Sequence, residues 1–231
     1  MLGGETIFDT LGARYVWEWS PYPQYYIPVA DIEAKFLVDE NHEQQLRRGI
    51  AHRHGLRAGD ADRPGSVRVY GAEADERVAN LAHIDWAALD AWYEEDELAF
   101  VHPRNPYVRV DALRSRRHVR VELDGVLLAE ADSLVLVFET GLPTRYYFDR
   151  TAVSFEHLRH TDTQTECPYK GTTSDYWTAV IGETVHDDIA WAYNFPTRQL
   201  LPIAGLVAFY DERVDTIIDG TAQPRPHTHF S

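Results

Sequence analysis

The chain is poor in cysteine, in basic residues and in long hydrophobic runs, and each shortage excludes a class of protein. Cys167 is the only cysteine among 231 residues, so no disulfide can form within the chain. No stretch approaches the roughly 18 consecutive apolar residues that a membrane-spanning helix needs. The opening residues, M-L-G-G-E-T-I-F-D-T, lack the basic and apolar regions of a signal peptide. We therefore expect a soluble, cytoplasmic protein.

The shortage of basic residues leaves a strongly acidic balance. Asp and Glu number 37 against 22 Lys and Arg, and the formal net charge is −15. A field of this sign repels phosphate backbones, so we expect neither nucleic acid nor membrane as a partner. A local cationic pocket for a small anion is still compatible with it, and a small-molecule ligand is possible. The sequence leaves the oligomeric state open.

Aromatic residues, in contrast, are abundant, and the chain repeats itself. It holds 6 Trp, 13 Tyr and 9 Phe, which suit small cores and ligand pockets. Residues 18–27 read E-W-S-P-Y-P-Q-Y-Y-I, and residues 139–148 read E-T-G-L-P-T-R-Y-Y-F. In both segments a glutamate, Glu18 or Glu139, precedes a Tyr-Tyr pair by seven positions.

Two further matches follow in the same order along the chain. I-D-W at 84–86 parallels I-A-W at 189–191, and L-A-F-V-H at 98–102 parallels V-A-F-Y-D at 207–211. Ordered matches of this kind indicate tandem copies of one fold. We place the first copy at 1–113, the second at 114–220, and a Pro-rich, frayed tail at 221–231.

The second copy has the pattern of a β domain. Residues 118–124 alternate apolar and polar, and Asp124-Gly125 is typical of a type I′ hairpin turn. Further strands are predicted at 134–139, 146–148, 176–181, 206–210 and 214–218. Helix is scarce, with short helices predicted at 151–158 and at 85–93, where Asp85 is the expected N-cap. We expect a mainly β protein of two bent-sheet domains with few short helices.

Several motifs of the second copy together carry a family resemblance. They are V-R-V-E-L-D-G-V-L-L-A-E-A-D-S, E-T-G-L-P-T-R-Y-Y-F, C-P-Y-K-G-T-T-S-D-Y-W, I-A-W-A-Y-N-F-P and I-A-G-L-V-A-F-Y-D. Residues 117–220 strongly resemble domain of unknown function 427, which is also labelled nucleotidyltransferase-like, and the first copy resembles a diverged member. The resemblance implies a β-rich, tent-like fold and no established activity. No P-loop and no Gly-Ser motif with paired aspartates supports the label, and no cofactor is expected.

The motif C-P-Y-K-G marks the candidate catalytic site. A nearby cation favours the reactive thiolate form of cysteine, and Lys170 lies three residues after Cys167. Glu139 could carry a proton or hold Lys170 in place. On this interpretation the protein is an enzyme with catalytic residues Cys167, Lys170 and Glu139. The candidate substrate-binding residues around them are Tyr147, His157, Tyr169, Tyr176, Trp191 and Tyr193.

Other interpretations of the same residues stay open. Cys167 could be a small buried hydrophobe in a well-packed turn. His157, His160 and Cys167 offer metal ligands, but structural zinc usually takes four, so no metal site is assigned. A non-catalytic module could hold a ligand in an aromatic cleft of Trp191, Tyr193 and Tyr176.

The first copy differs from the second in the residues of the C-P-Y-K-G motif. We align its segment 55–59, G-L-R-A-G, with C-P-Y-K-G, so that the thiol and the lysine are both absent there. In each Tyr-Tyr pair, one ring is expected in the core and the other toward a cleft or solvent, because adjacent strand residues face opposite ways.

Overall fold

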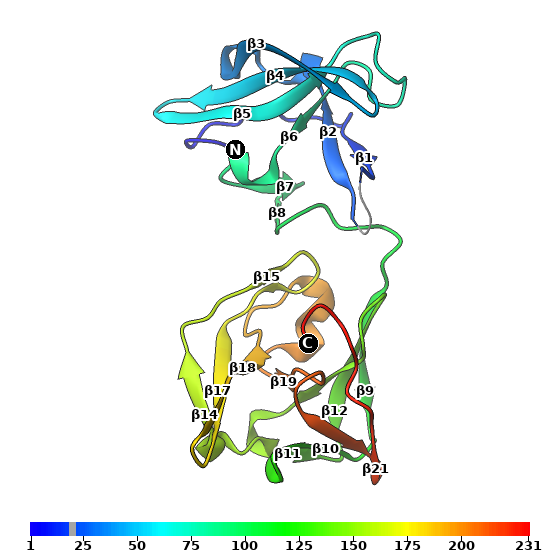
Figure 1. Ribbon diagram of the computed structural model, residues 1–231, viewed down its shortest axis with the longest axis vertical. Coiled ribbons are helices and arrows are strands. Elements are labelled where there is room, and N and C mark those ends of the chain that lie inside the picture. The colour runs from blue at the N-terminus through cyan, green and yellow to red at the C-terminus, as the bar shows by residue number, and fades with distance from the viewer. Residues whose placement is uncertain (19–21) are drawn as a thin grey trace. The chain divides into compact units, whose positions relative to one another are not determined.

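A computed structural model describes residues 1–18 and 22–231, which divide into two compact units, Met1–Asn105 and Pro106–Ser231 (Figure 1). Each unit has its own sheets and its own core. Residues 19–21, inside the first copy of the Glu…Tyr-Tyr motif, lie outside the described residues. Strands dominate both units, and the described helices are short 3-10 turns. The predicted mainly β fold with few short helices is confirmed.

The second unit is built on a seven-stranded antiparallel sheet, in the order β14-β17-β18-β19-β13-β12-β9. Strands β12, β13, β17 and β19 lie where strands are predicted from the sequence, whereas β9, β14 and β18 are not predicted. The bounds are β9 (Val110–Ser115), β12 (Leu134–Glu139), β13 (Arg145–Phe148), β14 (Leu158–Thr161), β17 (Asp175–Ile181), β18 (Thr184–Ala192) and β19 (Val207–Phe209).

A four-stranded sheet covers one face of the large sheet. It has the order β11-β10-β20-β21, with bounds Val126–Ala131, Val119–Leu123, Asp215–Ile218 and Thr221–Ala222. Asp124 and Gly125 join β10 to β11 with φ of 49° and 78°, as the predicted type I′ turn requires. Val121, Phe148 and Phe209 meet between the two sheets in one apolar cluster.

The opposite face of the large sheet carries a second cluster, rich in tyrosine and tryptophan. Neighbouring residues divide between the faces: Phe148 lies in the apolar cluster, and Tyr147 lies in the aromatic one. The 3-10 helix η6 (Arg198–Ile203) packs Leu200 and Ile203 against this aromatic face. Both faces of the sheet are thus covered. Tyr146, the partner of Tyr147, is half-buried against the apolar cluster rather than facing a cleft.

The two predicted helices are not continuous. Residues 151–158 form two separate 3-10 turns, η4 (Arg150–Ala152) and η5 (Phe155–His157), because Val153 between them is extended and bridges to Ala129. Of residues 85–93, only η3 (Trp86–Ala88) is helical, after which Leu89 is extended. Asp85 is the N-cap residue, as predicted, but its side chain makes no capping hydrogen bond. Pairing with neighbouring strands outweighs the weak helical preference of both segments.

The first unit has one six-stranded sheet, in the order β1-β2-β6-β5-β4-β3. This order matches β12-β13-β19-β18-β17-β14 of the second unit strand by strand. The equivalent tyrosines Tyr26 and Tyr147 are fully buried in both sheets. The strands of the first unit's sheet are β1 (Arg14–Val16), β2 (Gln24–Pro28), β3 (Leu37–Leu46), β4 (Gly49–Ala58), β5 (Ala61–Tyr70) and β6 (Leu81–Ile84). Two 3-10 turns, η1 (Val29–Asp31) and η2 (Ala34–Phe36), follow β2.

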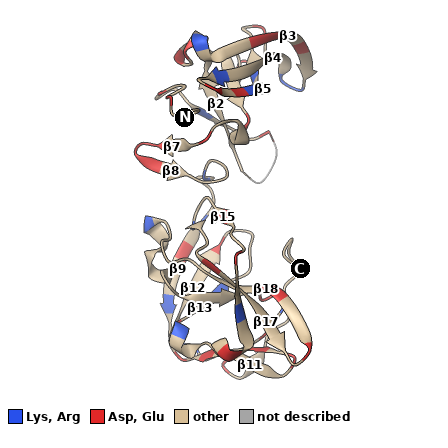
Figure 2. Cartoon of the chain, turned by 90° about the vertical axis from the view of Figure 1, so that its left-hand side faces the viewer, with Lys and Arg blue, Asp and Glu red and all other residues tan. Residues whose placement is uncertain are grey.

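This topology corrects two of the aligned landmarks. Ile84 ends β6, whereas Ile189–Trp191 lie in β18, whose equivalent is β5. Residues 98–102 begin in the hairpin of β7 (Trp92–Glu94) and β8 (Glu97–Ala99), which has an acidic turn, Glu94–Glu97 (Figure 2). That hairpin is a separate two-stranded sheet and is not the equivalent of β19. Three-residue apolar matches recur wherever strands are short, so they do not establish equivalence.

The division between the units and the path of the tail also differ from expectation. The units separate at Asn105–Pro106, so residue 113 falls inside β9 of the second unit. Residues 221–231 follow the surface of that unit. Arg225 Nε donates to Asp215 at 3.0 Å, and the Phe230 and Tyr210 ring centroids are 5.6 Å apart. Among the described residues, no helix has the length and apolar character to cross a membrane.

Phe148→Ala should lower the stability of the second unit by about 3–5 kcal/mol, because it leaves a cavity between its two sheets. Phe148 is fully buried, whereas Phe195 is 89% exposed, so Phe195→Ala is the matched control and should change little. Urea unfolding followed by tryptophan fluorescence measures both. Equal effects of the two variants would contradict the two-sheet core.

Candidate functional site

A buried ion pair stands at the end of the aromatic face. Glu139 ends β12, and Lys170 lies in the turn between β15 (Glu166–Cys167) and β16 (Gly171–Thr172). The Lys170 ammonium donates to the Glu139 carboxylate, with only 10% and 11% of the two side chains exposed. A charge buried to this extent is tolerated only when it is paired. The structure therefore joins two of the three predicted catalytic residues.

Backbone geometry holds the lysine turn in place. Gly171 has φ of 91°, a left-handed conformation that glycine adopts without steric cost. The carbonyl of Lys170 accepts from Thr197 N at 3.1 Å, and the carbonyl of Tyr169 accepts from Thr197 Oγ1 at 2.5 Å. The predicted turn function of C-P-Y-K-G is thus present, and the turn also carries a buried cation.

Electrostatics keep Lys170 charged. Burial alone lowers the pKa of its ammonium, but the neighbouring Cys167, Glu139 and Tyr147 outweigh burial and raise that pKa above its usual value. Lys170 is consequently a fixed cation at neutral pH and cannot serve as a general base there. Its available chemistry is electrostatic, in holding or stabilising a negative charge.

Two tyrosines stand beside this pair. Burial raises the pKa of Tyr147 to about 12, while Lys170 and a hydrogen bond from Trp191 partly oppose the rise. Trp191 Nε1 donates to Tyr147 Oη at 3.2 Å. Burial likewise raises the pKa of Tyr193 well above its usual value, with Tyr147 and Cys167 among the neighbours that contribute. Both phenols are therefore neutral hydrogen-bonding groups.

Cys167 is half-buried and pairs with Gly171 across the small β15–β16 hairpin. It lies near enough to Lys170, Tyr147 and Tyr193 to influence the charge of all three. The thiol, the lysine and the glutamate are thus gathered in one place. Tyr169, from the same turn, is half-buried.

The two histidines lie elsewhere. His157 ends η5, whose Phe155 packs into the apolar cluster on the other face of the sheet. His160 Nε2 lies 3.2 Å from Asp175 Oδ1, and its ring meets the edge of Trp177 in that same cluster. The structure therefore does not bring His157 to the predicted substrate site. Within residues 1–18 and 22–231, no group of three or more His, Cys, Asp or Glu side chains is placed to hold a metal.

The aromatic cleft expected from Trp191, Tyr193 and Tyr176 is filled. Their exposed fractions are 5%, 4% and 3%, because they pack against one another and against η6. Trp191 and Tyr193 therefore form core, while Tyr176 alone of the three also lines a cavity.

A second buried charge network escaped the sequence analysis. Arg145 Nη2 donates to Glu212 at 2.7 Å, and its Nη1 donates to Asp211 at 3.1 Å and to Glu212 at 2.6 Å. All three side chains are under one tenth exposed. Arg145 precedes Tyr147 by two residues and so shares its face of β13. Asp211-Glu212-Arg213 was predicted only as a turn, and no local signal marks its partner 66 positions earlier.

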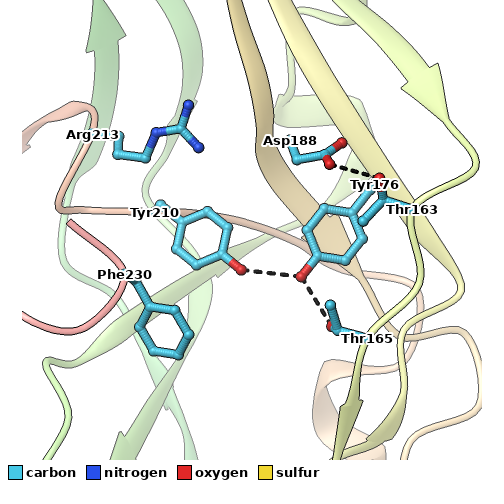
Figure 3. A pocket seen from close by; sticks show the side chains of 7 residues that line it. All are labelled: Thr163, Thr165, Tyr176, Asp188, Tyr210, Arg213 and Phe230. Atoms are coloured by element: carbon cyan, nitrogen blue, oxygen red, sulfur yellow. Dashed lines mark hydrogen bonds between the residues drawn. The ribbon is translucent and has the colours of Figure 1, made fainter.

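A cavity of about 280 Å³ opens beside this network. Figure 3 shows Tyr176 and Tyr210 meeting through their hydroxyls at its centre, and Arg213 and Asp188 on opposite sides. The Tyr176 hydroxyl lies 3.1 Å from that of Tyr210 and 3.0 Å from that of Thr165. The complete lining is Thr163, Thr165, Tyr176, Asp188, Tyr210, Arg213 and Phe230.

The first unit keeps a cation where the second has Lys170. Asp75 N donates to the carbonyl of Arg48 at 2.8 Å, as Thr197 N does to that of Lys170. Gly49 follows with φ of 122°, as Gly171 follows Lys170. Arg48-Gly49 is thus the counterpart of Lys170-Gly171. The alignment with 55–59 is wrong, because Gly55–Ala58 lies within β4.

The recurring glutamate also lies beside a cation in the first unit, where both side chains are half-buried. Glu18 accepts from the hydroxyl of Tyr26, the counterpart of Tyr147, and from Arg68 Nη2 at 3.0 Å. Burial opposes ionisation of Glu18, but Tyr26 and Arg68 prevail and lower its pKa. Arg68 occupies the strand position of Trp191, so the cation of the pair comes from strand β5 in the first unit and from the β15–β16 turn in the second.

Comparison with known proteins agrees with this repetition. Residues 1–95 and 111–220 both match the family described as domain of unknown function (DUF427). The chain belongs to this family and contains two copies of its domain, which confirms the predicted tandem repeat. No curated protein matches the chain.

Lys170→Met should lower the stability of the second unit by about 3–5 kcal/mol, because it leaves the Glu139 carboxylate buried and unpaired. The double variant Lys170→Met/Glu139→Leu should recover most of this loss, since it removes both charges. Chemical denaturation of the unaltered protein, Lys170→Met and the double variant measures their free energies of unfolding.

Lys35→Met is the control for Lys170→Met. Lys35 Nζ lies 3.0 Å from Glu33 Oε2, and both side chains are about 60% exposed, so losing this pair should cost under about 1 kcal/mol. If Lys170→Met costs no more than Lys35→Met, the Lys170–Glu139 pair is solvated and the buried-pair description is wrong.

Proposed function

We propose that the second unit binds a small molecule in the cavity beside Tyr176 and Tyr210. The observation that carries this proposal is the lining of the cavity, which combines hydroxyl groups with the two aromatic rings of Tyr210 and Phe230. Binding sites for small molecules characteristically pair aromatic walls with a few convergent polar groups. The volume of about 280 Å³ equals that of roughly nine liquid waters, which suits a ligand of about ten non-hydrogen atoms.

The state of the tyrosine hydroxyls supports this function. Burial and the hydrogen bond between its hydroxyl and that of Tyr176 raise the pKa of Tyr210, so its phenol is neutral at physiological pH. Three hydroxyls in a row, from Thr165, Tyr176 and Tyr210, share two hydrogen bonds. A hydroxyl has one donor and two acceptor positions, and Tyr210 Oη at the end of this row makes one hydrogen bond, so positions remain open for a ligand.

Thr163→Phe should abolish ligand binding, because it places a large ring in the cavity. A library of fragments of about ten non-hydrogen atoms is first screened against the unaltered protein by thermal shift, and calorimetry then measures the affinity of each hit. Thr163→Val is the matched control, since it removes the same hydroxyl without filling the space, and it should retain binding within a few fold. If fragments bind Thr163→Phe as tightly as the unaltered protein, the cavity is not the ligand site.

A second function, thiol chemistry at Cys167, is favoured by a separate observation. The only thiol of the chain lies half-exposed beside a buried, permanently charged lysine. A fixed cation stabilises a thiolate, the form of cysteine that attacks electrophilic carbon. On this proposal Cys167 is the nucleophile of an enzyme acting on a small molecule, Lys170 supplies the positive charge, and Glu139 positions Lys170.

Iodoacetamide should label Cys167 in the folded protein at pH 6 at least tenfold faster than it labels free cysteine, because Lys170 favours the thiolate. Intact mass spectrometry follows the rate. Lys170→Met/Glu139→Leu, which keeps a neutral pair in place, should remove this acceleration while circular dichroism shows the fold retained. Labelling only after denaturant is added would mean a packed cysteine and would end the thiol proposal.

A further inference from the structure

The cavity holds one charged group of each sign, on opposite sides (Figure 3). Arg213, in the turn after β19, lies on one side of the cavity, and Asp188, on β18, lies on the other. The Arg213 side chain has no hydrogen bond or ion pair with any residue in the described ranges. It is half-buried, so its charge faces the cavity without a protein partner.

The Asp188 carboxylate is held in place and still has hydrogen-bonding capacity. Thr161 Oγ1 and Thr163 Oγ1 donate to its two oxygens at 2.7 and 2.6 Å. An ionised carboxylate has about four acceptor positions, so two hydroxyl donors leave about half of them open. Asp188 has φ of 47° at an irregularity in the β17–β18 pairing, which fixes where its side chain points.

The balance of charge selects among ligands. A pure anion would gain from Arg213 but meet Asp188, and a pure cation would gain from Asp188 but meet Arg213. The nearby Arg145 adds no attraction for anions, because two carboxylates, Asp211 and Glu212, surround this single cation. A ligand that carries both charges satisfies both groups at once.

The remaining wall is apolar. Phe230 and Tyr210 lie side by side, with ring centroids 5.6 Å apart, on the Arg213 side of the cavity (Figure 3). Phe230 comes from the C-terminal segment, which Thr228 anchors by donating to Glu212 at 2.6 Å. These rings can cover the apolar body of a ligand whose charged groups point elsewhere.

We propose that this cavity binds a small zwitterion with an apolar body, of the amino-acid type. Its carboxylate pairs with Arg213, its ammonium binds Asp188, and its apolar part lies against Tyr210 and Phe230. This ligand class rests on the proposed binding function of the cavity and specifies it further.

The test measures binding of six defined probes to the full chain by calorimetry. L-leucine, L-phenylalanine and 6-aminohexanoic acid are zwitterions of different shape and charge separation. N-acetyl-L-leucine lacks the cation, L-leucinamide lacks the anion, and inorganic phosphate is an anion alone. At least one zwitterion should bind with a dissociation constant below about 10 mM. The two blocked leucine derivatives and phosphate should bind at least tenfold more weakly than the best zwitterion.

Two variants connect the charges to the residues. Arg213→Gln and Asp188→Asn should each weaken the best zwitterion at least tenfold. Arg159→Gln and Asp187→Asn are the matched controls, because both side chains are exposed and neither lines the cavity, and they should leave affinity unchanged. Asp188→Asn removes the carboxylate charge that accepts hydrogen bonds from Thr161 and Thr163, so circular dichroism first establishes that this variant folds. Arg213→Gln tests the contact with the ligand carboxylate independently.

The outcomes separate the ligand class from the binding function. If N-acetyl-L-leucine or phosphate binds as tightly as the best zwitterion, or if no zwitterion binds, the proposed class is overturned. If in that case a library fragment still binds and is lost in Thr163→Phe, the cavity remains a ligand site and only the class is wrong. Unchanged zwitterion affinity in Arg213→Gln and Asp188→Asn would also overturn it.

Discussion

Everything proposed for the second unit depends on one constraint, which is that both faces of its seven-stranded sheet are covered. One face packs on the four-stranded sheet and carries the apolar cluster. The other face buries tyrosines, a tryptophan and charged groups, which must find partners without water. Lys170 pairs with Glu139, Arg145 pairs with Asp211 and Glu212, and the tyrosine hydroxyls bond one another. The polar face is therefore a connected network, and the cavity lies at its edge.

The two copies solve this constraint differently. Both place a glutamate between the strand before the Tyr-Tyr pair and the pair itself or at that strand's end, and both set a cation against it, Lys170 in one and Arg68 in the other. Buried ion pairs contribute little net stability compared with apolar packing. The carboxylate is the element common to both copies, whereas the cation comes from a turn in one and from a strand in the other. The thiol has no such counterpart, because Gln45 stands three residues before Arg48 as Cys167 stands before Lys170.

Family membership adds no activity, since the family is one of unknown function. The two proposed functions therefore rest on the second unit alone, and they use different parts of its aromatic face. Cys167, Lys170 and Glu139 form one group around Tyr147. Thr163, Asp188, Tyr210 and Arg213 form another around Tyr176. Trp191 lies between the two groups, donating to Tyr147 and packing 4.4 Å from the ring of Tyr210.

The β character, the tandem copies, the Asp124-Gly125 hairpin and the grouping of Cys167 and Lys170 can all be predicted from the amino-acid sequence, because period-2 patterns, turn residues and short motifs are local signals. The sequence also predicted Glu139 near Lys170, through the charge that a buried carboxylate requires. The folded structure was needed to establish which strands are equivalent, that Arg48 replaces Lys170, and that residues 85–93 and 151–158 are not continuous helices. It alone brought Arg145 to Glu212 and Arg213 opposite Asp188. These contacts join residues distant in the chain, and strand order, which no local pattern encodes, places them together.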